Sequence, residues 1–166
     1  IPQTSKRVDF IVAGEDDNGN TNAIIVELKQ WEKVQHTTMN DIVLLGSEQH
    51  WHPSWQAYSY GSTLTNFNEY VEKNDINIIT CTFLHDYYSE YENEIRNEVY
   101  QEGLNNAPAF INKDYVAFAK FIGSKISKKS DVSLLYEIHN GKIKPSKFLV
   151  NTLASTLNGH DAVQLI

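Results

Sequence analysis

The sequence lacks most of the features that would place it outside a soluble globular domain. Its 166 residues include one cysteine, Cys81, so an internal disulfide is excluded and a reducing compartment is expected. No apolar run approaches the roughly 20 residues that span a bilayer. The polar opening IPQTSKR is not a signal peptide. We therefore expect a cytoplasmic protein without membrane contact and, because the first residue is Ile, a piece of a longer chain.

Two catalytic signatures are also missing. The sequence contains no GxxxxGK[ST] phosphate loop, so this chain by itself is not expected to hydrolyse ATP. No serine lies in a nucleophile-elbow setting, which leaves a hydrolase triad without support. Cys81 lies in the apolar run INIITCTFL and is interpreted as a small buried hydrophobic residue rather than a nucleophile.

Charge is unevenly distributed along the chain. The net charge is −7, which taken alone argues against a nucleic-acid partner. Residues 69–102 carry nine acidic residues against two basic ones, whereas residues 120–147 carry seven lysines against two acids. The lysine-rich segment is either a phosphate-binding surface or an ordinary solvated helix face.

Hydrophobic periodicity predicts an α/β fold. The first 31 residues resemble a β-hairpin with an Asn-Gly turn, and further strands are predicted at 41–46, 76–85 and 107–111. Helices are predicted at 52–73 and 113–126, the latter with an apolar stripe of Tyr115, Phe118, Phe121 and Ile122, and the acidic stretch 86–103 is expected to form a short surface helix. Beyond residue 130 two more helices are expected, ending at Gly141 and Gly159, before a final apolar run. We accordingly divide the chain into an α/β core, 1–130, and a helical extension, 131–166.

The predicted hairpin carries an unusual set of charges. Asp9 lies nine residues before Asn18 and Glu27 nine after it, so a turn centred on Asn18 places the two carboxylates opposite each other. Side chains alternate along a strand, which puts Lys29 on the same face. Opposed carboxylates repel, and a divalent cation would compensate them; ligation by oxygen alone favours Mg²⁺ or Mn²⁺. The alternative is the solvent-facing side of an edge hairpin, where such residues are ordinary.

A helical motif follows this hairpin. Gln56 and Tyr60 are four residues apart on the predicted helix and share a face. A D…ExK pattern followed about thirty residues later by QxxxY resembles the PD-(D/E)XK nuclease superfamily, in particular its RecB-like branch. The resemblance implies a mixed central β-sheet of the nuclease type, flanked by helices and followed here by C-terminal helical additions.

The resemblance also implies roles for individual residues. Asp9, Glu27 and the Leu28 carbonyl would bind Mg²⁺ or Mn²⁺, and Lys29 would support the attacking water. Gln56 and Tyr60 would lie beside the site and help to hold the nucleic-acid strand. Members of the branch take a further acid or His from a helix that precedes the hairpin. Either that helix lies outside this sequence, or the first motif is degenerate.

The stretches KRVDFIVAG, NAIIVELKQW, HPSWQAYSY and GKIKPSKFLVNTLASTLNGHDAVQLI also resemble the nuclease region of bacterial nuclease–helicase proteins. The helicase half of those proteins is a superfamily 1, Schlafen-related P-loop domain. This resemblance implies a nuclease acting on nucleic acid, with DNA the expected substrate and a helicase domain in the same full-length chain, in DNA metabolism or antiphage defence. The alternative is a catalytically silent module with a nuclease fold that binds nucleic acid or a partner.

Three other features have a functional and an ordinary interpretation. His50 and His52 form an HxH that could bind Zn²⁺, but no second ligand pair has suitable spacing, so residues at a helix entry are the simpler interpretation. His85 and Asp86 follow a buried strand and could act as an acid–base pair or form a local turn. The run of Tyr87, Tyr88 and Tyr91 could stack bases, although its acidic surroundings disfavour phosphates.

Overall fold

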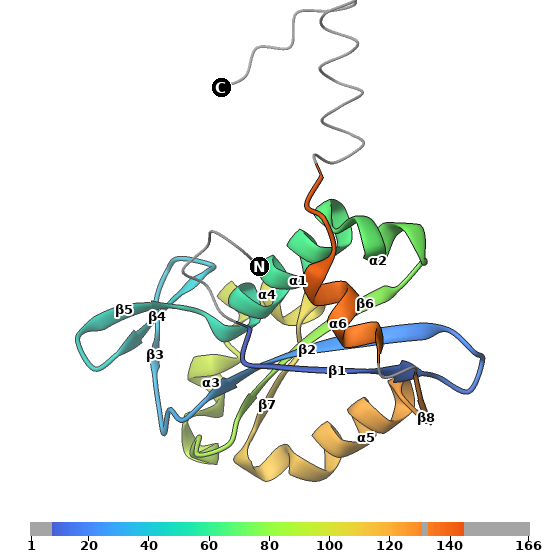
Figure 1. The fold of residues 1–166 in the computed structure, drawn as a ribbon. Coiled ribbons are helices and arrows are strands. Elements are labelled where there is room, and N and C mark those ends of the chain that lie inside the picture. Colours follow the sequence, from blue (N-terminus) through green and yellow to red (C-terminus); the bar gives the residue numbers. More distant parts are fainter. Residues whose placement is uncertain (1–7, 131–132, 145–166) are drawn as a thin grey trace, which may run out of the picture.

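A mixed five-stranded sheet organises the part of the chain that the computed structural model describes, residues 8–130 and 133–144 (Figure 1). The strand order is β7-β6-β2-β1-β8, in which β2, β6 and β7 run parallel and β1 and β8 run antiparallel to their neighbours. The strands are β1 (Phe10–Glu15), β2 (Thr21–Lys29), β6 (Asn77–Leu84), β7 (Ala109–Ile111) and β8 (Lys128–Lys129). The expected α/β class and its mixed central sheet flanked by helices are confirmed.

The hairpin of β1 and β2 has the predicted register. Phe10 pairs with Val26 and Glu15 with Thr21, so Asn18 lies at the centre of the turn. Asp16 shapes this turn by accepting the amides of Asn18 and Asn20, both at 2.9 Å. Gly19 follows with a φ of +82°, a conformation that residues with a Cβ rarely adopt. The local turn therefore fixes which residues face each other along the whole hairpin.

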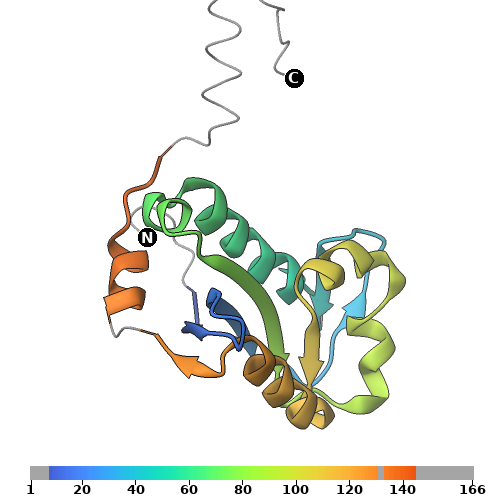
Figure 2. The ribbon, with the colours of Figure 1, turned by 90° about the vertical axis from the view of Figure 1, so that its right-hand side faces the viewer.

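Helices cover both faces of the sheet, as the two perpendicular views show (Figures 1 and 2). Odd-numbered residues of β2, Ala23 and Ile25, pack with Tyr60 and Leu64 of α1 in one hydrophobic cluster that also includes residues of α2 and α6. Even-numbered residues of β2 pack in a second cluster against α5 on the opposite face. The helices are α1 (Pro53–Phe67), α2 (Glu69–Lys73), α5 (Tyr115–Lys125) and α6 (Ser133–Asn140). Because β2 is central and covered on both faces, its residues 22–27 are all buried.

A second, antiparallel sheet of three strands lies beside the first. Its order is β3-β4-β5, built from β3 (Gln35–His36), β4 (Ile42–Leu45) and β5 (Glu48–Trp51). Val34 and Val43 join Leu84 and Tyr87 in a third hydrophobic cluster, which ties this sheet to the end of β6. The Thr37 amide donates to the Tyr100 hydroxyl at 2.9 Å, and that hydroxyl donates to the Ile42 carbonyl at 2.7 Å. The small sheet is thus fixed by long-range contacts.

Several expected elements differ from the structure. The strand predicted at 41–46 exists as β4 but belongs to the small sheet, and β3, β5 and β8 were not predicted. The helix predicted at 52–73 is broken at Asn68, whose side chain accepts the Val71 amide at 3.0 Å and caps α2. The expected helix at 86–103 is a series of short pieces, namely 3₁₀ helices at Ser89–Tyr91 and Glu98–Tyr100 and the helices α3 (Glu92–Ile95) and α4 (Gln101–Asn106).

The remaining expectations are met in part. Helix α5 follows a 3₁₀ turn at Asn112–Asp114 and packs the partly buried Phe118, Phe121 and Ile122 against the cluster on its face, whereas Tyr115 is 65% exposed and does not belong to the stripe. Cys81 is buried, and burial raises the pKa of its thiol to about 12, as its structural interpretation predicts. The helix expected to end at Gly159 and the final apolar run lie outside the described residues.

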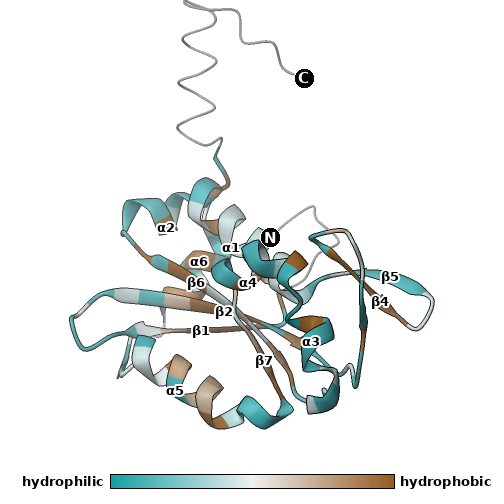
Figure 3. Cartoon of the chain, turned by 180° about the vertical axis from the view of Figure 1, so that it is seen from behind, coloured by the Kyte–Doolittle hydropathy of each residue, from teal (hydrophilic) through white to brown (hydrophobic). Residues whose placement is uncertain are grey.

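Hydrophobic residues concentrate on the large sheet, where β1 and β7 are drawn mostly in brown, while α2 is mostly hydrophilic (Figure 3). Within residues 8–130 and 133–144, no helix has the length and apolar character that crossing a membrane requires.

Candidate functional site

Asp9 and Glu27 face each other at one end of the hairpin. The register that pairs Phe10 with Val26 places Asp9 opposite Glu27 one step further along. The Leu28 amide donates to Asp9 Oδ2 at 3.1 Å, which holds the Asp9 carboxylate against β2. The geometry anticipated for these two carboxylates is therefore present.

Glu27 is a buried carboxylate with an incomplete set of partners. It is 1% exposed, and its main-chain carbonyl accepts the Thr82 hydroxyl at 2.9 Å. Its Oε1 accepts a hydrogen bond from Lys29 Nζ at 2.7 Å, whereas Oε2 has no hydrogen-bond partner in the described structure. Burial raises the pKa of Glu27, the Lys29 ammonium opposes this change, and the charge of Asp9 adds to it. A solvent-facing edge hairpin is contradicted here, because β2 is a central strand.

Lys29 connects the carboxylates to helix α1. Its Nζ donates to Gln56 Oε1 at 3.1 Å as well as to Glu27. Gln56 Nε2 in turn donates to the Tyr60 hydroxyl at 3.1 Å, across one turn of α1. Tyr60 is 6% exposed, and burial is the main cause of its raised pKa. The residues of the ExK and QxxxY patterns therefore form one hydrogen-bonded chain.

The start of α1 determines where Gln56 lies. His52 is the N-cap residue: its Nδ1 accepts the Ser54 amide at 3.2 Å, and its Nε2 donates to the Ile95 carbonyl at 2.8 Å. Pro53 follows in the first turn, where its missing amide proton is not needed. Both ring nitrogens of His52 are engaged, which excludes it as a zinc ligand in this structure and supports its interpretation as a helix-entry residue. His50 lies in β5, the strand that directly precedes helix α1.

An open cleft of about 500 Å³ begins at these side chains. It is lined by Asp9, Leu28, Lys29, Gln30, Trp31 and His85. Strands β2 and β6 are parallel, with Lys29 paired to Leu84, so residues that directly follow each strand meet at the same edge of the sheet. This edge is where ligands bind in many open α/β sheets.

His85 and Asp86 form the pair considered from the sequence. His85 Nδ1 lies 3.0 Å from Asp86 Oδ1, within a turn directly after β6. Asn112 Nδ2 donates to the His85 carbonyl at 2.6 Å and anchors this turn. The pair is thus part of a local turn, and its His85 also lines the cleft.

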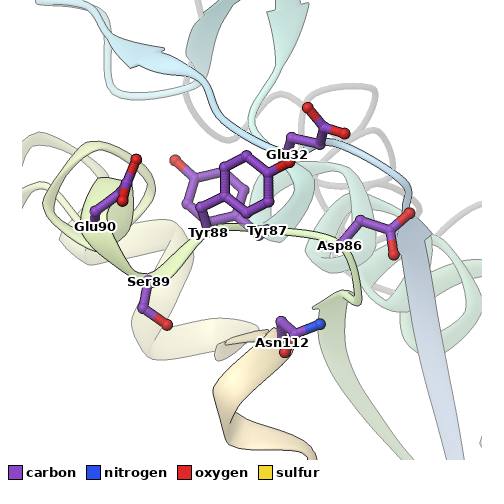
Figure 4. Close-up of a pocket in the computed structure, with 7 residues that line it drawn as sticks. All are labelled: Glu32, Asp86, Tyr87, Tyr88, Ser89, Glu90 and Asn112. Carbon is purple, nitrogen blue, oxygen red and sulfur yellow. The ribbon is translucent and has the colours of Figure 1, made fainter.

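A second hollow, of about 540 Å³, is strongly acidic (Figure 4). Three carboxylates reach it from separate segments: Glu32 beyond β2, Asp86 beyond β6, and Glu90 in the 3₁₀ helix that follows. The Tyr88 amide donates to the Glu32 carbonyl at 2.8 Å and ties two of these segments together. The hollow is lined by Glu32, Asp86, Tyr87, Tyr88, Ser89, Glu90 and Asn112. Glu32 and Asp86 directly follow the cleft residues Trp31 and His85, so the acidic hollow and the cleft are adjacent along both segments.

Among the described residues, the lysines of the segment 120–147 do not line the cleft. Lys128 and Lys129 form β8, which pairs with Glu15 and Gly14. They therefore lie beside the far end of β1, about 20 Å from Asp9 at the usual rise of a strand. Lys144 is paired with Glu69 at 2.9 Å on the surface.

The donor set of the site fits a hard divalent cation. Mg²⁺ is commonly bound by only one or two protein carboxylates. The site offers two facing carboxylates, and one of them has a buried oxygen that accepts no hydrogen bond. Within the described ranges no group of three His, Cys, Asp or Glu side chains could hold a metal ion. The expected contribution of the Leu28 carbonyl stays a prediction.

Sequence reasoning missed Gln30 and Trp31 among the residues that line the cleft. Trp31 could have been found by continuing the alternation of Glu27 and Lys29 for one more step. His85 had been considered, but its place beside Asp9 depends on the parallel pairing of β2 with β6, for which the sequence has no local signal.

Comparisons of the chain with models of protein families, with curated proteins and with solved structures find no match. The fold and the site define an α/β domain with a buried carboxylate–lysine centre. Its function has to be argued from those residues.

Proposed function

We propose that this chain is a metal-dependent nuclease domain that hydrolyses phosphodiester bonds, with DNA as its expected substrate. The observation that carries the proposal is the buried Glu27 carboxylate. It faces Asp9, is bonded to Lys29 and has one oxygen without a donor, and both of these neighbours line an open cleft. Burying such a group costs stability, and a catalytic requirement gives a reason to keep it.

The two carboxylates are the groups that would hold Mg²⁺ or Mn²⁺. A bound ion would supply positive charge for the phosphate and lower the pKa of a water. Asp9 is fixed for this purpose by the Leu28 amide, and Glu27 by its buried position in the central strand.

Lys29 is suited to holding the attacking water or a phosphate oxygen. An ammonium has three donors, and two of them are directed at Glu27 and Gln56. The third remains for a group in the cleft that Lys29 lines. Gln56 and Tyr60 act through Lys29, because their hydrogen bonds restrict where its ammonium can lie. The water would lose a proton and attack phosphorus while the opposite P–O3′ bond breaks. The leaving 3′ oxygen would take up a proton from solvent, so that the products are a 3′-hydroxyl end and, as the nuclease resemblance implies, a 5′-phosphate end.

The wider proposal rests on the sequence resemblance. A nuclease–helicase protein would join this domain to a helicase half in the same chain, in DNA metabolism or antiphage defence. A catalytically silent module that binds nucleic acid is the competing function.

Cleavage of labelled single- and double-stranded DNA in Mg²⁺, Mn²⁺ or EDTA tests the proposal. The variants are Glu27→Gln and the matched control Asp17→Asn, which removes one negative charge from the exposed turn of the same hairpin. We expect metal-dependent cutting by the wild type and the control, and a loss of at least roughly 100-fold in Glu27→Gln.

A readout without catalysis accompanies this assay. Mg²⁺ or Mn²⁺ should raise the melting temperature of the wild type and of Asp17→Asn but not that of Glu27→Gln. Nucleic-acid binding by a folded wild type, without cutting and without a metal-induced shift, would establish the silent module instead.

A further inference from the structure

Trp31 continues the functional face of β2 beyond the end of the strand. Glu27, Lys29 and Trp31 are spaced by two residues, and Trp31 lines the same cleft as Lys29 and Asp9. Lys29 Nζ lies 2.7 Å from Glu27 Oε1 and 5.2 Å from the centroid of the Trp31 ring, so the carboxylate and the ring are at most about 8 Å apart. A flat aromatic surface therefore lies within the span of one nucleotide from the carboxylates.

The ring is held in place by the small sheet. Trp31 packs against the hydrophobic cluster that contains Val34 and Val43. Its ring also contacts His50 of β5, with centroids 5.5 Å apart and planes inclined by 60°. An aromatic side chain supported in this way offers a contact surface with little conformational entropy left to lose.

The charges beyond Trp31 determine what can bind there. Glu32, Asp86 and Glu90 line the acidic hollow that adjoins the cleft (Figure 4). Their carboxylates repel phosphates, whereas an uncharged base carries no such penalty. The wall at Trp31 therefore favours a base over a continuing backbone.

We propose that Trp31 stacks the base of the nucleotide next to the scissile phosphate, and that the site consequently selects unpaired strands. The substrate assignment rests on the proposed nuclease function. In a duplex, neighbouring base pairs cover both faces of each base, so stacking on a protein ring requires an unstacked nucleotide. Base–aromatic stacking typically contributes roughly 5- to 150-fold in affinity per base.

The test measures binding in EDTA, where no cleavage occurs. The probes are a six-residue oligothymidylate, an abasic oligonucleotide of the same length and charge, and a short blunt duplex. The proteins are the wild type, Trp31→Ala, Trp31→Phe and the control Trp51→Phe, which alters a tryptophan that is 51% exposed and does not line the cleft.

We expect the wild type and Trp51→Phe to bind oligothymidylate at least roughly 5-fold more tightly than the abasic strand or the duplex. Trp31→Ala should bind all three with similar affinity, and Trp31→Phe should recover part of the preference. Circular dichroism verifies that each variant is folded, and Trp31→Phe keeps the test informative if the alanine variant is not.

Equal binding of the normal and abasic strands by the wild type, a preference that persists in both Trp31 variants, or no binding at all would overturn the inference. A preference that depends on Trp31 in a protein that never cuts DNA would uphold the stacking role and refute the nuclease. Metal-dependent cutting without any preference for the oligothymidylate would uphold the nuclease and refute the stacking role.

Discussion

Replacing Glu27 by Gln should stabilise the fold while abolishing activity. Burial raises the pKa of Glu27 above its ordinary value of 4.5, so the folded chain holds this proton to higher pH than the unfolded chain does. The contribution of this group to stability therefore falls as the pH rises above 4.5. The ionised carboxylate is therefore a cost to the fold, and glutamine, which is neutral and nearly the same shape, removes it.

The size of the effect follows from the contacts of the two oxygens. Glutamine Oε1 can keep accepting from Lys29, and its Nε2 can donate toward Asp9, where Glu27 Oε2 has no partner. Relieving an unsatisfied buried polar group is worth about 1–2 kcal/mol. For a chain of this size that corresponds to a rise of roughly 2–8 °C in melting temperature.

Urea and thermal unfolding at pH 7 in EDTA measure this difference, with Asp17→Asn as the control. The decline in wild-type stability between pH 4.5 and 7 that comes from Glu27 should also be missing from the variant. Adding Mg²⁺ at a hundredfold excess over its Kd should stabilise the wild type by about 2.7 kcal/mol and leave Glu27→Gln unchanged, which reverses their order. A variant less stable than the wild type in EDTA would refute the reasoning, because the ion pair with Lys29 would then outweigh the cost of burial.

Three further predictions concern the scaffold. Gly61→Ala should destabilise the protein by about 1–3 kcal/mol in urea unfolding, because a methyl group there overlaps the Thr80 methyl where α1 crosses β6; an unchanged midpoint would contradict this close packing. Burial lowers the pKa of His52 to about 4. As the pH falls below 6.5, His52 is therefore protonated in the unfolded chain before it is protonated in the folded chain. Stability should drop by on the order of 3 kcal/mol across that window, and the drop should be absent in His52→Asn. Asn68→Ala should cost about 2–3 kcal/mol, since it removes both the cap of α2 and a 2.8 Å hydrogen bond to Ile138 in α6; a loss of less than about 0.5 kcal/mol would contradict that role.

The hairpin and its charged face could be predicted because their determinants are local. The Asn18–Gly19 turn sets the register, and the register alone brings Asp9 opposite Glu27. The four-residue spacing of Gln56 and Tyr60 likewise follows from helix geometry. The chain of hydrogen bonds among these residues is therefore accessible from sequence patterns.

The elements that escaped prediction depend on distant partners. Residues 35–36 and 48–51 have no apolar alternation, and contacts with Tyr100 and with the cluster around Val43 hold their sheet in place. The break at Asn68 falls within a continuous helical pattern, and its side chain is bonded to Ile138, 70 residues later. No window of neighbouring residues carries that information.

The small sheet has a consequence for how this domain can change its specificity. The chain leaves the central sheet after Lys29 and enters helix α1 at its N-cap, His52, so residues 32–51 form an excursion that starts at one wall of the cleft and ends at the helix that carries Gln56. The carboxylates and Lys29 lie outside it, with Glu27 and Lys29 on β2 and Asp9 directly before β1. Grafting another sequence of similar span between these two anchor points would change the support of the Trp31 ring while leaving Asp9, Glu27 and Lys29 untouched. The proposed strand preference and the proposed chemistry would then depend on separable segments of one short chain.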